Sequence, residues 1–357
     1  MKLFINGTGN VSAQRGWDSI SDPGGPAGYS GRMIRCPEPE ADTGLDDKYI
    51  RRMSRMIRLG WIAARLCLDD AGNPVPDAII TGSGWGSVLD SEKFLLSIYK
   101  NNENLLPPTP FIQSTHNAVG AQVAMLLGNC SYNMTYAHGI FAFEHAMLDA
   151  MLCFMEGGKN NILLGGFDEI TDNQFILTDR LGRWRKEPVQ SLEMIDRKSK
   201  GTVAGEGYSF FFLQDHPSST TYARLTGVRT IYRTDNKDDV SVAIIKFLDD
   251  HGLKPGDISC IFAGYNGDER GDLYYGDVLA GVFRKGVPEA RWKHLTGDYL
   301  TAGAFATWAA CQSIKAQTIP ASLLSSGHPQ APIRYILIYN HFNCAHHSLI
   351  LISHPDE

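Results

Sequence analysis

A histidine stands at a position where many folds place a nucleophile. The β-prone run that begins at Ser131 ends at Ala137-His138-Gly139, and a long apolar helix is expected to follow. A side chain at such a corner lies above the first helical turn, close to N–H groups without partners. The positive helix end disfavours a cationic imidazole, so we expect His138 to be neutral. It could be acylated, but an acyl-imidazole is labile and would lose the acyl group to water.

The surrounding elements predict an α/β protein with two similar halves. Residues 2–6 read as a strand that leaves through a tight glycine turn over 7–12, and apolar spacing predicts one helix over 46–72. Further apolar runs alternate with helical segments along the chain, which favours buried sheets. A polar linker after residue 214 divides the chain into expected halves at 1–215 and 216–357.

The composition excludes several classes of protein. The 357 residues carry a net charge of −6, so nucleic acid is not an expected partner. The seven cysteines have no CxxC spacing, which favours reduced and mostly buried thiols in a cytoplasmic protein. The chain has no apolar run of 18 residues, so membrane insertion is not expected. We also expect no cofactor and no metal site.

Other reactive side chains have simpler structural explanations. His346 and His347 are adjacent on an expected strand and face opposite ways, which disfavours a metal pair. Cys130, eight residues before His138, is expected to be a buried thiol and not a substitute nucleophile. For His116, in Thr115-His116-Asn117, two readings stay open: it lines a cavity on the dimer side, or it is an ordinary packed histidine.

Several blocks together resemble the β-ketoacyl synthase family. They occur in the family's order and span almost the whole chain: Ile5-Asn-Gly-Thr-Gly-Asn-Val-Ser12, Pro110-Phe-Ile-Gln-Ser-Thr-His-Asn117, Ile162-Leu-Leu-Gly-Gly-Phe-Asp-Glu-Ile170, Ala204-Gly-Glu-Gly207 and Trp292-Lys-His-Leu-Thr-Gly-Asp298. The resemblance implies the α/β thiolase-like fold, in which two similar halves stack as α-β-α-β-α layers. It also implies a dimer.

The catalytic residues that the resemblance implies are all replaced. A condensing ketosynthase uses a cysteine and two histidines. His138 stands at the cysteine position, and Asp298 stands at the second histidine. The first histidine corresponds to Asn266, or to Tyr265 after a shift of one residue, while the family's lysine is retained as Lys293. These replacements make a normal Claisen condensation improbable.

Asp298 is the replacement with the largest expected effect. An ionised carboxylate would repel the carboxylate of malonate by roughly 4 kcal/mol at about 4 Å and an effective dielectric near 20. It also lacks the donor that an oxyanion site requires.

The resemblance also suggests where an acyl chain and a carrier protein would bind. Phe141 and Phe143 begin the helix that borders the acyl tunnel in the family, so they could set its depth, although ordinary core packing is the alternative. Basic clusters could dock an acidic acyl carrier protein, although such clusters are more often a solvated face. They are Arg51-Arg52-Arg55, Arg180-Arg183-Arg185-Lys186, and Arg284-Lys285 with Arg291-Lys293.

The sequence therefore predicts a non-condensing, chain-length-factor-like homologue. It would pair with an active ketosynthase subunit as a heterodimer, or with itself, in a bacterial type II fatty-acid or polyketide system such as one for aryl polyene-like pigments. The alternatives are an acyltransferase, thioesterase or decarboxylase with altered chemistry at His138 and Asp298, or an acyl-thioester binding protein.

Overall fold

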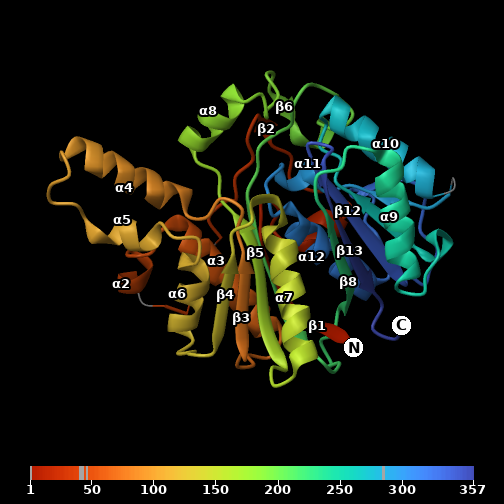
Figure 1. The fold of residues 1–357 in the computed structure, drawn as a ribbon, viewed down its shortest axis with the longest axis horizontal. Coiled ribbons are helices and arrows are strands. Elements are labelled where there is room, and N and C mark those ends of the chain that lie inside the picture. Colours follow the sequence, from red (N-terminus) through yellow and green to blue (C-terminus); the bar gives the residue numbers. More distant parts are fainter. Residues whose placement is uncertain (1, 40–43, 46, 284–285) are drawn as a thin grey trace.

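The computed structural model describes residues 2–39, 44–45, 47–283 and 286–357. Within them, eleven strands form one mixed sheet in the order β11-β10-β9-β12-β13-β8-β1-β7-β5-β3-β4. The sheet is continuous because β1 pairs antiparallel with β7 on one side and with β8 on the other. The expected α/β class is confirmed (Figure 1).

The elements of the first part are β1 Leu3–Val11, α1 Trp17–Ser21, β2 Ser30–Gly31, α2 Asp47–Ile50, α3 Arg55–Asp70, β3 Ala78–Gly82, α4 Val88–Lys100, α5 Pro108–Gln113, α6 Ala118–Leu126, β4 Tyr132–Tyr136, the 3₁₀ turn η1 Gly139–Phe141, α7 Ala142–Glu156, β5 Asn161–Asp168, α8 Asp172–Arg180, β6 Val189–Gln190, η2 Ser191–Glu193 and β7 Gly207–Gln214. Those of the second part are β8 Ala223–Ile231, α9 Lys237–Asp249, η3 Pro255–Asp257, β9 Cys260–Ala263, α10 Glu269–Val282, β10 Glu289–Ala290, α11 Lys293–Thr296, α12 Ala302–Ala316, β11 Leu324–Ser326, β12 Tyr335–Phe342 and β13 His346–Ser353.

The two halves repeat one strand order. Numbered along the chain, the first five long strands (β1, β3, β4, β5, β7) lie in the order third, second, fourth, fifth, first, and so do β8, β9, β10, β12 and β13. This repetition has no visible counterpart in the sequence. β7 ends at Gln214 and β8 begins at Ala223, so the predicted boundary at 215/216 falls in their connection and stays a prediction.

Two apolar helices form the central layer between the halves. α7 packs on β3, β4 and β5 and also reaches β8, whereas α12 contacts strands of both halves. The side chains of α12 are buried along most of its length, including Phe305, Trp308 and Ile314. α3 and α6 cover the outer face of the first half, and α9 and α10 cover that of the second (Figure 1). This arrangement gives the predicted five layers.

The expected glycine turn after residue 6 is wrong, because β1 continues to Val11. Its glycines allow α3 to lie directly on the strand. A Cβ at Gly7 would come within 2.6 Å of Ala71 Cβ and of the Cys67 carbonyl oxygen, and a Cβ at Gly9 would overlap the backbone of α3. These two glycines are therefore required by a helix packed across the strand, and not by a turn.

The predicted helix over 46–72 is two helices. α2 ends at Ile50 and α3 begins at Arg55, after a short break. Ser54 is the N-cap of α3, and its hydroxyl accepts a hydrogen bond from the Ile57 N–H at 3.5 Å. Residue 46 lies outside the described residues. A serine at this position satisfies a donor of the first turn, which fixes the start of α3.

An arm formed by α4 and α5 projects from the first half of the molecule (Figure 1). Large apolar side chains are exposed along it: Leu95, Leu96, Tyr99, Leu105, Phe111 and Ile112. Leu105, between the two helices, is 96% exposed. Such a concentration of exposed apolar side chains is unusual for the surface of a monomer.

Candidate functional site

His138 occupies the corner that the sequence predicts. β4 ends at Tyr136, and η1 begins at Gly139, whose φ of 55° makes the sharp change of direction. The imidazole of His138 is exposed, stacks on Phe141 at 5.9 Å between ring centroids, and lies 4.7 Å from the ring of His145. Burial, together with the neighbouring His138, lowers the pKa of His145. The corner thus carries two neighbouring imidazoles.

Three other predicted residues come together around Asp298. The Lys293 Nζ lies 2.8 Å from Asp298 Oδ1, and the Asn266 amide nitrogen lies 3.4 Å from Asp298 Oδ2. Burial alone would raise the pKa of Asp298, but Lys293 and then Arg183 hold it below its usual value. Asp298 is therefore an ionised carboxylate in a buried ion pair. Tyr265, the alternative to Asn266, donates instead to Glu289 at 3.0 Å.

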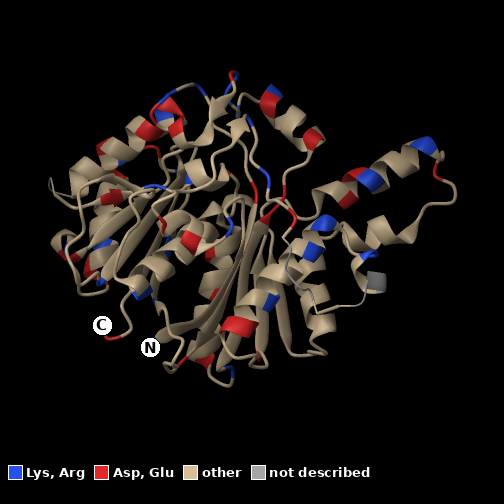
Figure 2. Ribbon diagram, turned by 180° about the vertical axis from the view of Figure 1, so that it is seen from behind, with Lys and Arg blue, Asp and Glu red and all other residues tan. Residues whose placement is uncertain are grey.

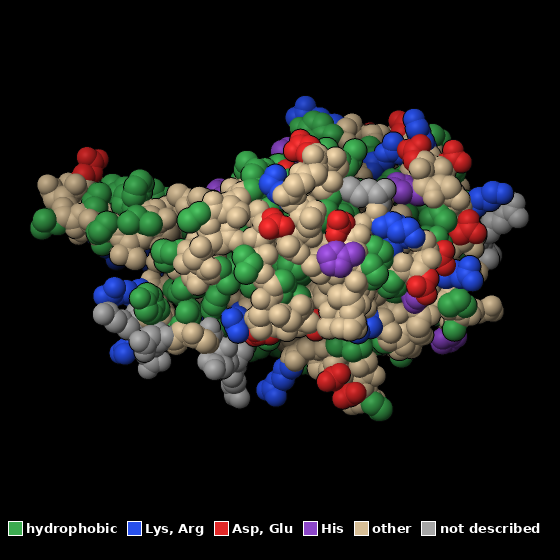
Figure 3. All heavy atoms as spheres, turned by 90° about the horizontal axis from the view of Figure 1, so that it is seen from below, with side chains coloured by type: hydrophobic (Ala, Val, Ile, Leu, Met, Phe, Trp, Pro, Cys, Tyr) green, Lys and Arg blue, Asp and Glu red, His purple; other side chains and the backbone are tan. Residues whose placement is uncertain are grey.

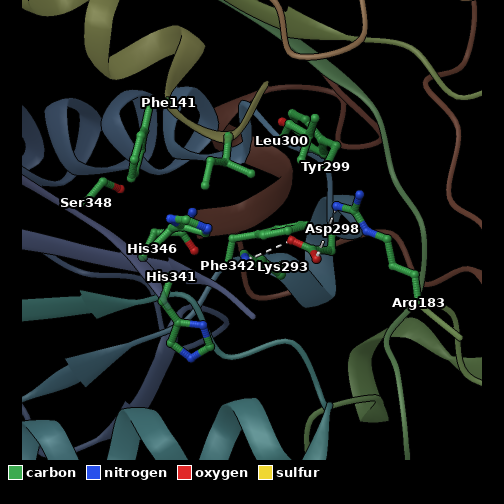
Figure 4. Close-up of a pocket in the computed structure, with 12 residues that line it drawn as sticks. Phe141, Arg183, Lys293, Asp298, Tyr299, Leu300, His341, Phe342, His346 and Ser348 are labelled. Carbon is green, nitrogen blue, oxygen red and sulfur yellow. Dashed lines mark ion pairs between the residues drawn. The ribbon is translucent and has the colours of Figure 1, made fainter. Parts of the chain in front are cut away.

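Arg183 is a member of this site that sequence reasoning placed elsewhere. It was expected in a basic surface cluster, but its side chain is only 16% exposed, and its guanidinium lies 3.9 Å from Asp298 Oδ2. That separation is an ion pair without a hydrogen bond. The guanidinium also lies 4.8 Å from the ring centroid of Trp184 and 5.1 Å from that of Phe342. Figure 4 shows Arg183 and Lys293 approaching Asp298 from different sides.

The position of Arg183 changes the electrostatic expectation for this site. The sequence predicts that an ionised Asp298 repels a substrate carboxylate. Lys293 and Arg183 offset its charge, so the repulsion is expected to be weaker than that of an unpaired carboxylate, and it stays a prediction. The missing donor remains, because an ionised carboxylate only accepts hydrogen bonds.

A small cavity of about 20 Å³ lies against this ion pair. Its lining comes from η1, the segment after α8, α11 and the residues that follow it, and β12 and β13: Ile140, Phe141, Arg183, Lys293, Asp298, Tyr299, Leu300, Asn340, His341, Phe342, His346 and Ser348 (Figure 4). A space of this size holds about one water molecule. Ile140 and Phe141, which follow the His138 corner, line it together with Asp298, whereas His138 and Asn266 are not among its lining residues.

Two further titratable groups near the cavity were not singled out from the sequence. Glu144 on α7 is 2% exposed, and its Oε2 has no hydrogen-bond partner. Burial raises its pKa to about 7, although Ser348 and Lys293 act in the opposite direction. Burial lowers the pKa of His341 to about 3, and this residue lines the cavity. Neither residue stands in a motif with recognisable spacing, so no local signal in the sequence marks them.

The predicted tunnel residues lie in three different surroundings. Phe141 is buried and lines the cavity. Phe143 is fully buried in the core and lies 5.9 Å from Phe211 between ring centroids. His116 is exposed and lies against Gly86. The role of these residues in a tunnel stays a prediction.

One surface expectation is wrong. Cys130 is exposed because it precedes β4 at the edge of the sheet, although the other six cysteines are buried. The basic clusters are mixed: Arg55 pairs with the fully buried Glu206 at 2.6 Å and Arg185 is 5% exposed, whereas Arg180 and Lys186 are exposed, so carrier-protein docking stays a prediction. Residues 284–285 lie outside the described residues. Basic and acidic residues are interspersed along the ribbon of the described residues in the view of Figure 2.

Within the described ranges, no group of three or more His, Cys, Asp or Glu side chains could hold a metal ion. No helix in the same part of the chain has the length and apolar character needed to cross a membrane.

The comparisons with known proteins agree with the fold. Residues 45–193 match the family described as "Beta-ketoacyl synthase, N-terminal domain". No curated protein matches the sequence. A β-ketoacyl synthase from Burkholderia phymatum STM815 is 16% identical and has a TM-score of 0.79, with 99% of each chain covered. The ishigamide ketosynthase/chain length factor is 17% identical with a TM-score of 0.80, covering 99% of this chain and 98% of that chain. The ketosynthase ApeO in complex with its chain length factor ApeC, from Xenorhabdus doucetiae, is 17% identical with a TM-score of 0.76 and the same coverage.

Proposed function

We propose that this chain is a non-condensing, chain-length-factor-like subunit, because residues 45–193 match the β-ketoacyl synthase N-terminal domain family and the whole chain has the ketosynthase fold. In this role it pairs with an active ketosynthase and shapes a shared acyl tunnel in a bacterial type II polyketide or fatty-acid system. The similarity to two structures of ketosynthases with chain length factors supports this role.

The observation that carries the proposal is the ion pair of Asp298 with Lys293. A Claisen condensation needs hydrogen-bond donors for the enolate that develops in the transition state. Asp298 supplies none, and the Asn266 amide is directed at Asp298 itself. Removing one donor of this kind commonly costs about 100- to 1000-fold in rate. His138 also stands at the predicted position of the acyl-carrying cysteine. The chain therefore lacks both the nucleophile that carries the acyl group and the donor at position 298 that would stabilise the enolate.

The size of the cavity supports the same conclusion. About 20 Å³ beside Asp298 has no room for an acyl chain, and His138 lies outside it. A condensing site must bring a thioester carbonyl and an enolate together between the nucleophile and the oxyanion donors. His138 and Asn266 are not among the residues that line the cavity beside Asp298.

Two exposed features support a protein partner. β4 is an edge of the sheet within the described residues, so one side of its backbone offers unpaired N–H and C=O groups. The arm of α4 and α5 carries a group of exposed apolar side chains, and apolar side chains gather at one end of the molecule in Figure 3. Apolar surfaces of this kind are typical of protein–protein interfaces. A ketosynthase or a second copy of this chain could cover them.

Mixing this protein with candidate ketosynthases tests the proposal. Each is combined at equal concentration, and the mass of the species is measured by sedimentation velocity, with the separate proteins as controls. We expect a stable 1:1 complex with at least one active ketosynthase. A homodimer that remains unchanged with every candidate would contradict the pairing role.

The exposed His138–His145 pair supports a second candidate function, acyl transfer or thioester hydrolysis at His138. A neutral imidazole can attack a thioester, and the second imidazole can accept a proton. Incubation with acyl and malonyl thioesters, with release of free thiol as the readout, tests this candidate. Turnover that His138→Ala abolishes would support it, and turnover equal to the background would remove it.

A further inference from the structure

Three imidazoles from both halves of the chain gather at the corner after β4. The ring centroid of His138 lies 4.7 Å from that of His145 on α7, and His346 at the start of β13 lies near enough to His138 for their charges to interact. The ring centroid of Phe141 is 5.9 Å from those of both His138 and His145 and 6.1 Å from that of His346. His138 is exposed and the other two are partly exposed, so the three form a histidine cluster at the surface.

The groups around the histidine cluster supply one cation and neutral rings. Arg233 acts on the charge of His346, and its backbone N–H donates to His346 Nδ1 at 3.4 Å. A proton on that nitrogen would remove the acceptor. Tyr136 of β4 lies 6.3 Å from His145 and Tyr232, after β8, lies 4.9 Å from His346, between ring centroids. Tyrosine hydroxyls are neutral in the pH range in which histidine titrates.

The acids on α7 beside the cluster are engaged elsewhere. Asp149, one turn after His145, is 9% exposed and accepts a hydrogen bond from the Tyr132 hydroxyl at 3.1 Å. Glu144 is buried and faces Ser348 and the backbone of α12.

No ion pair therefore balances a protonated histidine cluster. Among the histidines of the described residues, only His216 and His354 lie within ion-pair distance of a carboxylate. Each proton added to the cluster creates an imidazolium beside another imidazole or beside Arg233.

The cluster lies at the carboxyl end of the sheet edge that is open to a partner. β4 ends at Tyr136, two residues before His138, and within the described residues β3 is its sole neighbour in the sheet. A strand added along the other side of β4 would lie about 4.8 Å away. A partner that covers this edge therefore comes within reach of the exposed imidazole of His138.

We propose that protonation of the histidine cluster, below about pH 6.5, releases the partner that covers the β4 edge. The inference rests on the pairing role proposed above and adds its regulation. A partner that covers an imidazole removes water from it, and loss of water disfavours the charged form. The complex thus holds fewer protons than the separate proteins, so pairing strengthens as the pH rises and weakens as it falls.

The state of the partly exposed members agrees with this direction. Burial, and then the neighbouring positive groups, lower the pKa of His145 and of His346 from its ordinary value. Both are therefore neutral at pH 7, and the cluster gains its charge when the solution becomes acidic.

The affinity for a ketosynthase that forms a complex at about pH 8 is measured again at about pH 5.5 and the same ionic strength. We expect pairing at least tenfold weaker at the lower pH. A variant with His138→Gln, His145→Gln and His346→Gln should lose most of this dependence, and titration of the partner cancels because the partner is the same. His328→Gln is the matched control, since His328 is exposed two residues after β11, at the opposite edge of the sheet, and should keep the dependence.

Proton release on pairing gives a readout that needs no folded triple variant. Calorimetry of the wild-type protein at about pH 6, in two buffers with different enthalpies of ionisation, should show net release of protons. The single variant His138→Gln, at an exposed position, should release fewer.

Absence of any complex at about pH 8 would contradict the pairing role itself, and this inference would fall with it. A complex of equal or higher affinity at about pH 5.5 overturns the inference alone. So does a folded triple variant with the pH dependence of the wild type, or pairing of the wild type without proton release.

Discussion

The Nζ of Lys293 lies 2.8 Å from Oδ1 of Asp298, and both side chains are almost entirely removed from water. From its resemblance to a known family, the sequence predicts that Asp298 takes the place of a histidine and that Lys293 is a retained lysine. In that prediction a carboxylate that accepts hydrogen bonds replaces a donor and becomes the counter-ion of Lys293. This single relationship turns a position expected to be catalytic into part of a buried ion pair.

Removal of the carboxylate should destabilise the fold. Asp298→Asn leaves Lys293 buried without its counter-ion, and breaking a buried pair in this way costs about 3–5 kcal/mol. The free energy of unfolding in urea provides the readout. Asp196→Asn, which breaks the more exposed pair with Arg291, is the control and should cost about 1 kcal/mol or less. Equal losses in the two variants would contradict the structural importance of the buried pair.

Glu144 should make stability fall as the pH rises. Its pKa is raised from an ordinary 4.5 to about 7, so folding takes up a proton between these values. The corresponding stability is present below about pH 4.5 and is lost as the pH rises to about 7, by up to roughly 3 kcal/mol. Glu144→Gln should flatten this part of the profile, measured by urea unfolding from pH 4.5 to 8. Glu156→Gln, at the exposed end of α7, should leave the profile unchanged.

The glycines of β1 should not tolerate a methyl group. Gly7→Ala would place a Cβ within 2.6 Å of two atoms of α3, and overpacking of this kind costs about 1–3 kcal/mol. Gly24→Ala is a matched control, since nothing lies within 4 Å of its Cβ position and its φ is not positive. The melting temperatures of the two variants show whether the loss of stability comes from the contact with α3 or from the added methyl group alone. A Gly7→Ala protein as stable as the control would show that α3 can move away from the strand.

The arm of α4 and α5 should be needed for pairing but not for folding. Ile112 is 67% exposed, so Ile112→Glu should leave the melting temperature unchanged and weaken the complex with a ketosynthase at least tenfold. Leu181→Glu, at an exposed site after α8, is the control for a general effect of added charge. Sedimentation or calorimetry gives the affinity. An unchanged affinity in Ile112→Glu would place the partner elsewhere.

The sequence alone determined the class of the fold and the corner at His138. Apolar periodicity and turn residues are local, so alternating strands and helices can be read from them, and the ordered blocks from Ile5 to Asp298 pointed to the family. The same residues identified Lys293 and Asp298 as members of one site. Two element boundaries differ from the prediction. β1 continues through its glycines because α3 packs across them, which is a contact between separate elements. α3 begins at its own cap, Ser54, which apolar spacing alone does not mark.

Only the tertiary structure decided which side chains share the site. Arg183 reaches Asp298 across 115 positions of sequence, so its basic neighbours in the chain suggested a surface instead. Burial also raises the pKa of Glu144, because of the elements packed around α7 and not because of adjacent residues. Cys130 is exposed because β4 lies at a sheet edge. Charge compensation, burial and edge position depend on residues brought together from distant parts of the chain, and local patterning does not encode them.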